Sequence, residues 1–108
     1  MLTVKTFIIH PSHPSIAGHF PEHPVVPGVV LLEQIEIALD EHLQNWEVIE
    51  IVQAKFIEIV LPGETVEVKF NDGFMTNPQS INFQLVNSAT QKRVVTGKVK
   101  LAIIKEGI

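Results

Sequence analysis

The second half of the chain alternates between apolar and polar positions in a way that predicts β-strands. Residues 65–70, 80–85 and 95–103 have an apolar residue or glycine at every second position, and residues 46–60 form a longer apolar-rich stretch. A period of two places alternate side chains on opposite faces, so each strand should have one buried and one solvent-facing side. Residues 3–10 are rich in β-branched side chains and predict a further strand. Turn-forming residues separate the later stretches at 61–64, 71–73 and 87–92.

Residues 27–44 have the pattern of one helix. Pro27 suits a first-turn position, and good helix formers dominate from Leu31 to Gln44. The positions expected to face the core are Leu31, Ile35, Ala38 and Leu39. The positions on the opposite side are Glu33, Glu36 and Asp40. Three apolar residues lie three or four positions from Glu33, namely Val29, Val30 and Ile37, so the first half of the helix should be buried on two sides.

Together these elements predict an α+β fold, in which an antiparallel sheet of about five strands packs against one helix. The length of 108 residues fits a single domain that covers residues 1–108. A domain of this size buries only about two-thirds of the surface that its unfolded chain exposes. A partner subunit is therefore expected.

Composition and charge exclude several classes of function. The formal net charge of -4 and the isoelectric point near 5.7 argue against a nucleic-acid partner. The absence of cysteine excludes disulfides, a thiolate zinc site and a cysteine nucleophile. No stretch reaches the ~18 apolar residues of a membrane span, and the first residues lack the features of a secretory signal. We therefore expect a cytoplasmic protein without a membrane partner.

A loop rich in proline and histidine precedes the predicted helix. Residues 11–27 hold five of the seven prolines, which leaves this loop few conformations. The histidines in or directly before it are His10, His13, His19 and His23. Imidazole is a common metal ligand, but this spacing without cysteine matches no standard zinc pattern. We expect no metal and no other cofactor.

Three residues of this region form a candidate acid–base site. His19 lies in the loop, and Gly28 lies at the helix N-terminus, where backbone N–H groups lack partners and favour negative charge. Glu33 lies among aliphatic side chains, where a carboxyl group tends to keep its proton. Such a base, donor and acid would suit a carbonyl substrate. From composition alone, a structural His19, a solvated Glu33 and a turn-forming Gly28 are the alternatives.

The segment from Gly18 to Glu33 resembles the active-site motif of the β-hydroxyacyl-acyl carrier protein dehydratases, the FabA and FabZ type. That motif runs His-Phe-Pro-Gly-x-Pro-x-x-Pro-Gly-Val and then has Glu or Asp on the helix. The matching residues are His19, Phe20, Pro21, Pro24, Pro27, Gly28 and Glu33. Glu22 stands where the family has glycine. A second, weaker match consists of Lys55-Phe56 and the turn Leu61-Pro62-Gly63-Glu64.

This resemblance implies a hotdog fold, in which the sheet wraps around a central helix. It also implies dehydration of a 3-hydroxyacyl thioester to a trans-2-enoyl thioester, in fatty acid synthesis or a related lipid or polyene pathway. His19 would remove the C2 proton, Glu33 of a partner subunit would protonate the leaving hydroxyl, and the Gly28 N–H would polarise the carbonyl. The residues expected to line the substrate site are Phe20, Val26, Pro27, Val29, Val30 and Ile37.

The implied partners are an acyl carrier protein, which carries the acyl-phosphopantetheine substrate, and further copies of the chain, as a dimer or a hexamer. The carrier protein of this family is acidic, so docking should need a basic patch. Its candidates are Lys55, Lys92, Arg93, Lys98, Lys100 and Lys105. Two other functions fit the same fold: a hotdog acyl thioesterase, and a non-catalytic subunit that binds the carrier protein.

Overall fold

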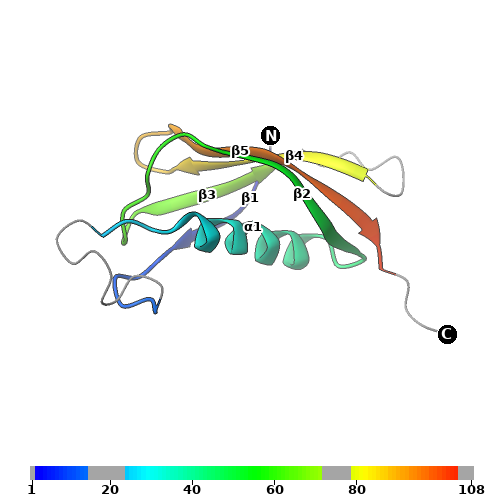
Figure 1. The fold of residues 1–108 in the computed structure, drawn as a ribbon, viewed down its shortest axis with the longest axis horizontal. Helices are drawn as coiled ribbons and strands as arrows, with labels where there is room; N and C mark the ends of the chain where they lie inside the picture. Colours follow the sequence, from blue (N-terminus) through cyan, green and yellow to red (C-terminus); the bar gives the residue numbers. More distant parts are fainter. Residues whose placement is uncertain (1, 15–23, 72–78, 105–108) are drawn as a thin grey trace.

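The computed structural model describes residues 2–14, 24–71 and 79–104 and shows five antiparallel strands curved around one helix (Figure 1). The elements along the chain are β1 (Leu2–Ile8), α1 (Gly28–His42), β2 (Trp46–Phe56), β3 (Thr65–Phe70), β4 (Gln79–Asn87) and β5 (Arg93–Ile103). Within these described ranges, no helix has the length and apolar character needed to cross a membrane.

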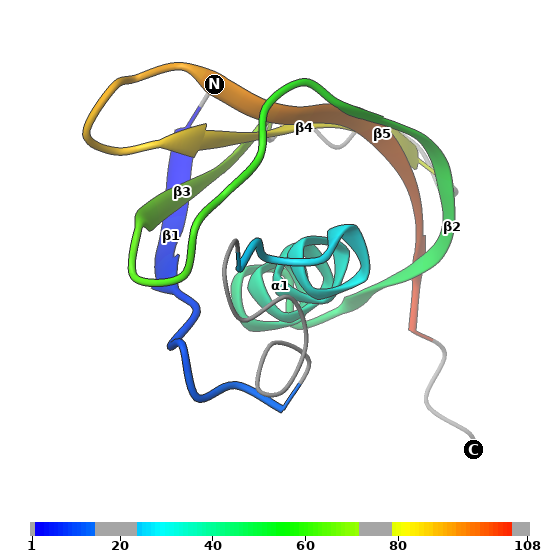
Figure 2. The same ribbon diagram turned by 60° about the vertical axis from the view of Figure 1, so that its left-hand side comes forward.

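The order of strands across the sheet is β1-β3-β4-β5-β2, and every neighbouring pair is antiparallel. The helix joins β1 to β2, which are the two edges of the sheet, so the connection crosses the concave face. Figure 2 shows α1 lying inside the curve of the sheet. The predicted class, one helix and five antiparallel strands, is confirmed.

The core lies between the concave face and one side of α1. On the helix, Leu31, Ile35 and Leu39 are almost fully buried, as their spacing predicted. On the sheet, Phe70 of β3 and Phe83 of β4 are register partners, and both side chains are buried in this core. In β3, and over residues 81–85 of β4, alternation thus supplies buried residues to the inner face and leaves polar residues on the convex outer face.

The ends of two elements differ from the prediction. The helix begins at Gly28 because Pro27 has an extended backbone (φ -61°, ψ 147°) and lies outside the helix as its N-cap. β2 ends at Phe56 and does not continue to residue 60. The chain bends there because the N–H groups of Ile57 and Glu58 both turn toward the Val94 carbonyl, at N···O distances of 2.8 and 3.3 Å.

The second side of α1 is not buried within one chain, so its burial stays a prediction that depends on a partner subunit. Val29 is 62% exposed and Ile37 is 41% exposed. The edge strand β2 is similar, because Ile49 and Val52 fall at irregular positions in its pairing with β5 and are each about half exposed. One chain therefore leaves apolar side chains in solvent along one side of the helix and on β2.

Candidate active site at the N-terminus of the helix

The N-terminus of α1 presents backbone N–H donors that have no acceptor among the described residues. The Pro27 carbonyl accepts the N–H groups of Val30 (3.0 Å) and Leu31 (3.3 Å). The N–H groups of Gly28 and Val29 precede the first helical hydrogen bond, so the helix offers them no carbonyl. The first turn also carries no acidic side chain that could neutralise the positive end of the helix dipole. An oxygen that gains negative charge would be stabilised here.

Two contacts hold this end of the helix in place. The N–H of Val26 donates to the carbonyl of Val60 at 2.8 Å, which ties the segment before α1 to the segment after β2. The ring of Phe56 lies against Gly28: a Cβ added at Gly28 would lie 3.0 Å from Cε1 and Cζ of that ring. Glycine at position 28 therefore lets the aromatic ring approach the backbone closely.

An open, mainly apolar cavity of about 380 Å³ lies beside Gly28. Its lining residues are Val26, Gly28, Leu31, Phe56, Ile57, Glu58, Ile59 and Val60. Three of these side chains are largely exposed: Phe56 to 49%, Ile57 to 45% and Ile59 to 69%. Apolar walls next to unpaired N–H donors suit a molecule that has both a hydrocarbon part and a polar carbonyl group.

The cavity also shows which residues the sequence prediction of the substrate site missed. Phe56, Ile57 and Ile59 were not among the predicted site residues. Among them, only Phe56 had a signal in the sequence, namely the weaker family match at Lys55-Phe56. The apolar pattern itself gave no signal, because an apolar run after a strand looks the same whether it is buried or lines a cavity.

Glu33 points away from this cavity. It lies five residues after Gly28, which on an α-helix is about 140° around the axis and about 7.5 Å along it. Glu33 is exposed and is absent from the cavity lining. The exposed stripe of α1 to which it belongs consists of Val29, Glu33, Glu36, Ile37 and Asp40. A single chain therefore does not bring Glu33 and Gly28 to one site.

The other predicted site residues fall into three groups. Val26 shares the cavity with Gly28, and Pro27 lies directly between them. Val30 is only 1% exposed and belongs to the core of the chain, and its contact with substrate stays a prediction. Val29 and Ile37 flank Glu33 on the exposed stripe. The predicted residues His19 and Phe20 lie outside the described residues, as does Glu22.

Comparison with known proteins adds a family and a fold. Residues 3–98 match the model of the ApeI-like family, described as the ApeI dehydratase. A 3-hydroxyacyl-[acyl-carrier-protein] dehydratase FabZ of Wolbachia pipientis wMel is 28% identical over 105 residues, which covers 85% of this chain and 69% of that protein.

Two solved structures have the same fold. One is the dehydratase heterocomplex ApeI:P of Xenorhabdus doucetiae, with 24% identity and a TM-score of 0.70 over 90% of this chain and 83% of that one. The other is a hexameric thioesterase of Yersinia pestis, with 14% identity and a TM-score of 0.75 over 97% of this chain and 88% of that one. The predicted hotdog fold is confirmed.

Proposed function

The chain belongs to the ApeI-like dehydratase family, and from this premise we propose that it removes water from 3-hydroxyacyl thioesters to give trans-2-enoyl thioesters. His19 would take the proton from C2, and the electron pair left there would form the C2=C3 bond. The hydroxyl group would leave C3 with a proton from Glu33, so that water is the second product. The Gly28 N–H would stabilise the thioester oxygen while it is enolate-like.

The observation that carries this proposal is the placement of unpaired helix N–H groups at an apolar cavity. Loss of a C2 proton puts negative charge on the thioester oxygen, and a helix N-terminus favours negative charge. The cavity beside Gly28 would hold the first part of the acyl chain. Both features lie in a chain that matches a dehydratase family over residues 3–98.

We further propose that each site is completed by a second copy of the chain. Glu33 and Gly28 face different directions on one helix, so the acid must come from elsewhere if both act on one substrate. The exposed apolar residues next to Glu33 (Val29 and Ile37), together with Ile49 and Val52 on β2, are suited to burial in such an interface. The Xenorhabdus relative is a heterocomplex, so a different subunit in this place is the alternative that a mass measurement tests.

The proposed substrate is carried by an acyl carrier protein, because the related FabZ proteins act on carrier-linked 3-hydroxyacyl groups. The test is to incubate the purified protein with 3-hydroxyacyl thioesters of several chain lengths, linked to carrier protein or to pantetheine. The proposal predicts a product lighter by one water, with the absorbance of a conjugated enoyl thioester. Release of free thiol would contradict it in favour of hydrolysis. No product from any chain length would favour the binding role.

A further inference from the structure

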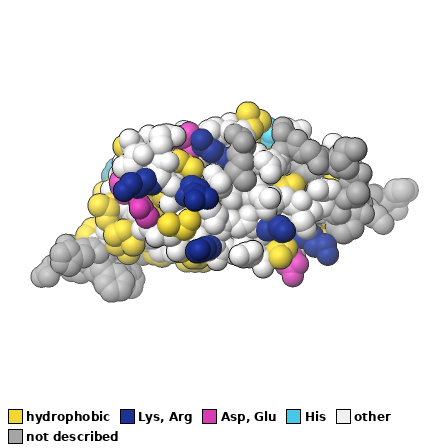
Figure 3. All heavy atoms as spheres, turned by 90° about the horizontal axis from the view of Figure 1, so that it is seen from above, with side chains coloured by type: hydrophobic (Ala, Val, Ile, Leu, Met, Phe, Trp, Pro, Cys, Tyr) yellow, Lys and Arg dark blue, Asp and Glu magenta, His cyan; other side chains and the backbone are white. Residues whose placement is uncertain are grey.

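The convex face of the sheet carries a concentration of cations that the net charge of -4 conceals. Strand register places Lys69 of β3 opposite Gln84, Lys98 of β5 opposite Asn82, and Lys55 of β2 opposite Thr96. Lys69 lies between buried Val68 and Phe70, and Lys98 precedes buried Val99, so both side chains point outward. Lys55 precedes Phe56, whose ring lies against Gly28 on the inner side, so Lys55 also points outward. We call this surface the basic face; its cations are Lys55, Lys69, Arg93, Lys98 and Lys100. Figure 3, which views the sheet from the side opposite the helix, shows Lys and Arg side chains spread across it.

A shallow hollow of about 300 Å³ lies within the basic face. It is lined by Gln53, Asn82, Phe83, Gln84, Arg93, Thr96, Gly97 and Lys98. This lining combines two cations with three amide side chains, and it includes no acid. Lys55, Arg93 and Lys98 form no ion pair with another described residue. Their charge is therefore available to an external partner.

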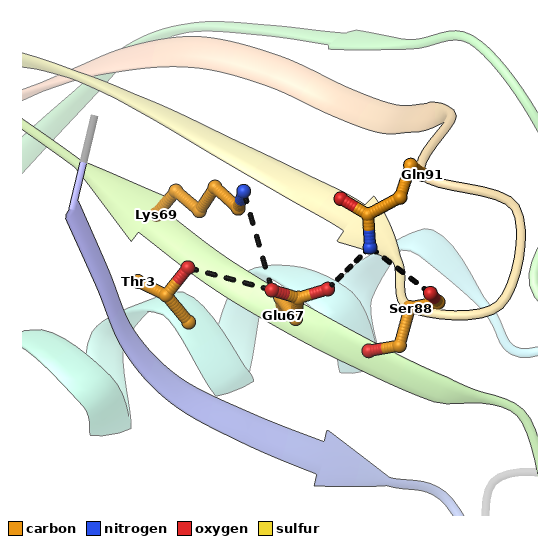
Figure 4. Close-up of polar contacts among 5 residues, drawn as sticks. All are labelled: Thr3, Glu67, Lys69, Ser88 and Gln91. Carbon is orange, nitrogen blue, oxygen red and sulfur yellow. Dashed lines mark hydrogen bonds and ion pairs between the residues drawn. The ribbon is translucent and has the colours of Figure 1, made fainter.

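The carboxylates on this face do not cancel the positive charge of its cations. Glu67 lies beside Lys69, with Nζ and Oε1 at 4.0 Å, and accepts hydrogen bonds from Gln91 (3.0 Å) and Thr3 (3.4 Å), as Figure 4 shows. The hydrogen bond from Gln91 is the main cause that lowers the pKa of Glu67 below its ordinary value of 4.5. Glu50, further along β2, lies opposite Lys100 in the register of β2 and β5. The lining of the hollow itself holds the cations Arg93 and Lys98 and no carboxylate.

The basic face adjoins the candidate active site through β2. Successive side chains of a strand point to opposite faces. Phe56, the last residue of β2, lies against Gly28 on the inner side. Lys55, directly before it, pairs with Thr96 at the hollow on the outer side. A partner on the basic face would therefore stand at the end of the strand that leads to the cavity.

We propose that the basic face is the docking surface for an acidic carrier protein, whose thioester arm would pass around the end of β2 to reach Gly28. This inference rests on the proposed function, because a carrier-linked substrate is what requires a docked protein. Electrostatic complementarity of this kind raises the association rate and selects the partner, and it weakens as salt screens the charges. Of the six docking candidates from the sequence, it retains Lys55, Arg93, Lys98 and Lys100. It adds Lys69 and sets aside Lys92, which lies in the turn between β4 and β5 and not on a strand of this face, while Lys105 lies outside the described residues.

The test compares Lys98→Glu with Lys5→Glu, which makes the same change of formal charge, from -4 to -6, at a lysine paired with Glu41 away from this face. We expect Lys98→Glu to raise the KM for a carrier-linked substrate about tenfold, and to leave kcat and the KM for a pantetheine-linked substrate within about twofold of the wild type. Lys98→Glu/Arg93→Glu should have a larger effect, and added salt should reduce the difference between wild type and variants.

Direct titration with the carrier protein separates this inference from the proposed function. Weaker carrier binding by Lys98→Glu than by Lys5→Glu supports docking, even if the wild-type protein dehydrates nothing. Active wild-type protein whose KM for the carrier-linked substrate responds equally to both variants would overturn the docking inference and leave the proposed function intact.

Discussion

The two sides of the sheet differ in chemistry and in what each can contribute to function. The concave side holds the helix, its unpaired N–H groups at Gly28 and an apolar cavity. The convex side holds cations and amide side chains around a shallow hollow. One strand, β2, contributes to both sides, because Phe56 lies against Gly28 while Lys55 lies outside.

Because the two sides carry different groups, activity and partner binding should be separable by mutation. Changes on the concave side should lower turnover with every substrate, because they touch the reacting groups. Changes on the convex side should affect only substrates that bring a protein with them. A chain with an overall negative charge can thus bind an acidic partner through one face, because exposed charges act over about a Debye length, roughly 8–10 Å.

The largest effect should come from Glu33→Gln, which removes the proposed acid from the helix. Turnover should fall by about 10²- to 10⁴-fold with carrier-linked and pantetheine-linked substrates alike. The stability of one folded chain should be unchanged because Glu33 is exposed in it. Glu36→Gln is the matched control on the same exposed stripe, and single-turnover rates measure both. An equal loss of turnover in the two variants would contradict the role of Glu33 as the acid.

A second variant, Gly97→Ala, should damage both sides at once. A Cβ at Gly97 would overlap the backbone carbonyl of Gln53 and come within 2.6 Å of Cζ of Phe83. The carbonyl cannot move without shifting β2, so we expect a loss of about 1–3 kcal/mol or more in the free energy of unfolding. Urea denaturation measures it. Thr96→Ala, one residue away, is the control. Wild-type stability of Gly97→Ala would contradict the close approach of β2 and β5.

Gly28→Ala should have a smaller and more local effect. Its Cβ would meet the ring of Phe56 at 3.0 Å, and this half-exposed ring can shift into the cavity. We expect the stability to change by less than about 1 kcal/mol, and kcat to fall tenfold or more because the substrate is displaced. Adding Phe56→Leu should restore part of the turnover. A double variant no more active than Gly28→Ala would show that Phe56 does not form that wall.

The smallest effect should come from Glu67→Gln on the convex side. The pKa of Glu67 is lowered in the folded chain, chiefly by the hydrogen bond from Gln91. Its carboxylate therefore stabilises the fold above the ordinary pKa of 4.5, and this contribution disappears as the pH falls through the lower folded value. The Tm difference between wild type and Glu67→Gln should be present at pH 7 and vanish in acid. A Tm difference that does not change with pH would contradict stabilisation by the ionised carboxylate of Glu67.

Much of the fold could be predicted from the sequence because alternation and helical spacing report directly on burial. Val66, Val68 and Phe70 alternate with polar residues and are all fully buried, and Ile35 and Leu39 are the core of the helix as expected. Strand ends were less predictable. Phe56 ends β2 because of hydrogen bonds to Val94 that no local pattern reveals.

The candidate site was predictable only in part. The motif identified Gly28 and Glu33, and the structure places both on α1, but on different sides of it. The role of Phe56 depends on a contact between residues 28 positions apart, which a pattern of single residues does not contain. The basic face was also predictable only in part. Alternation indicates that Lys98 points outward, but which residues lie beside Lys98 depends on the order of strands in the sheet. The role of His19 stays a prediction.

Mixing two inactive variants shows whether two subunits build each site. His19→Ala and Glu33→Gln are purified, unfolded together, refolded and assayed for dehydration. In a random mixture half of the dimers are mixed, and each mixed dimer has one intact site. If two subunits build each site, about a quarter of the wild-type activity should therefore be recovered. Mixed dimers confirmed by mass that remain as inactive as either parent would contradict it.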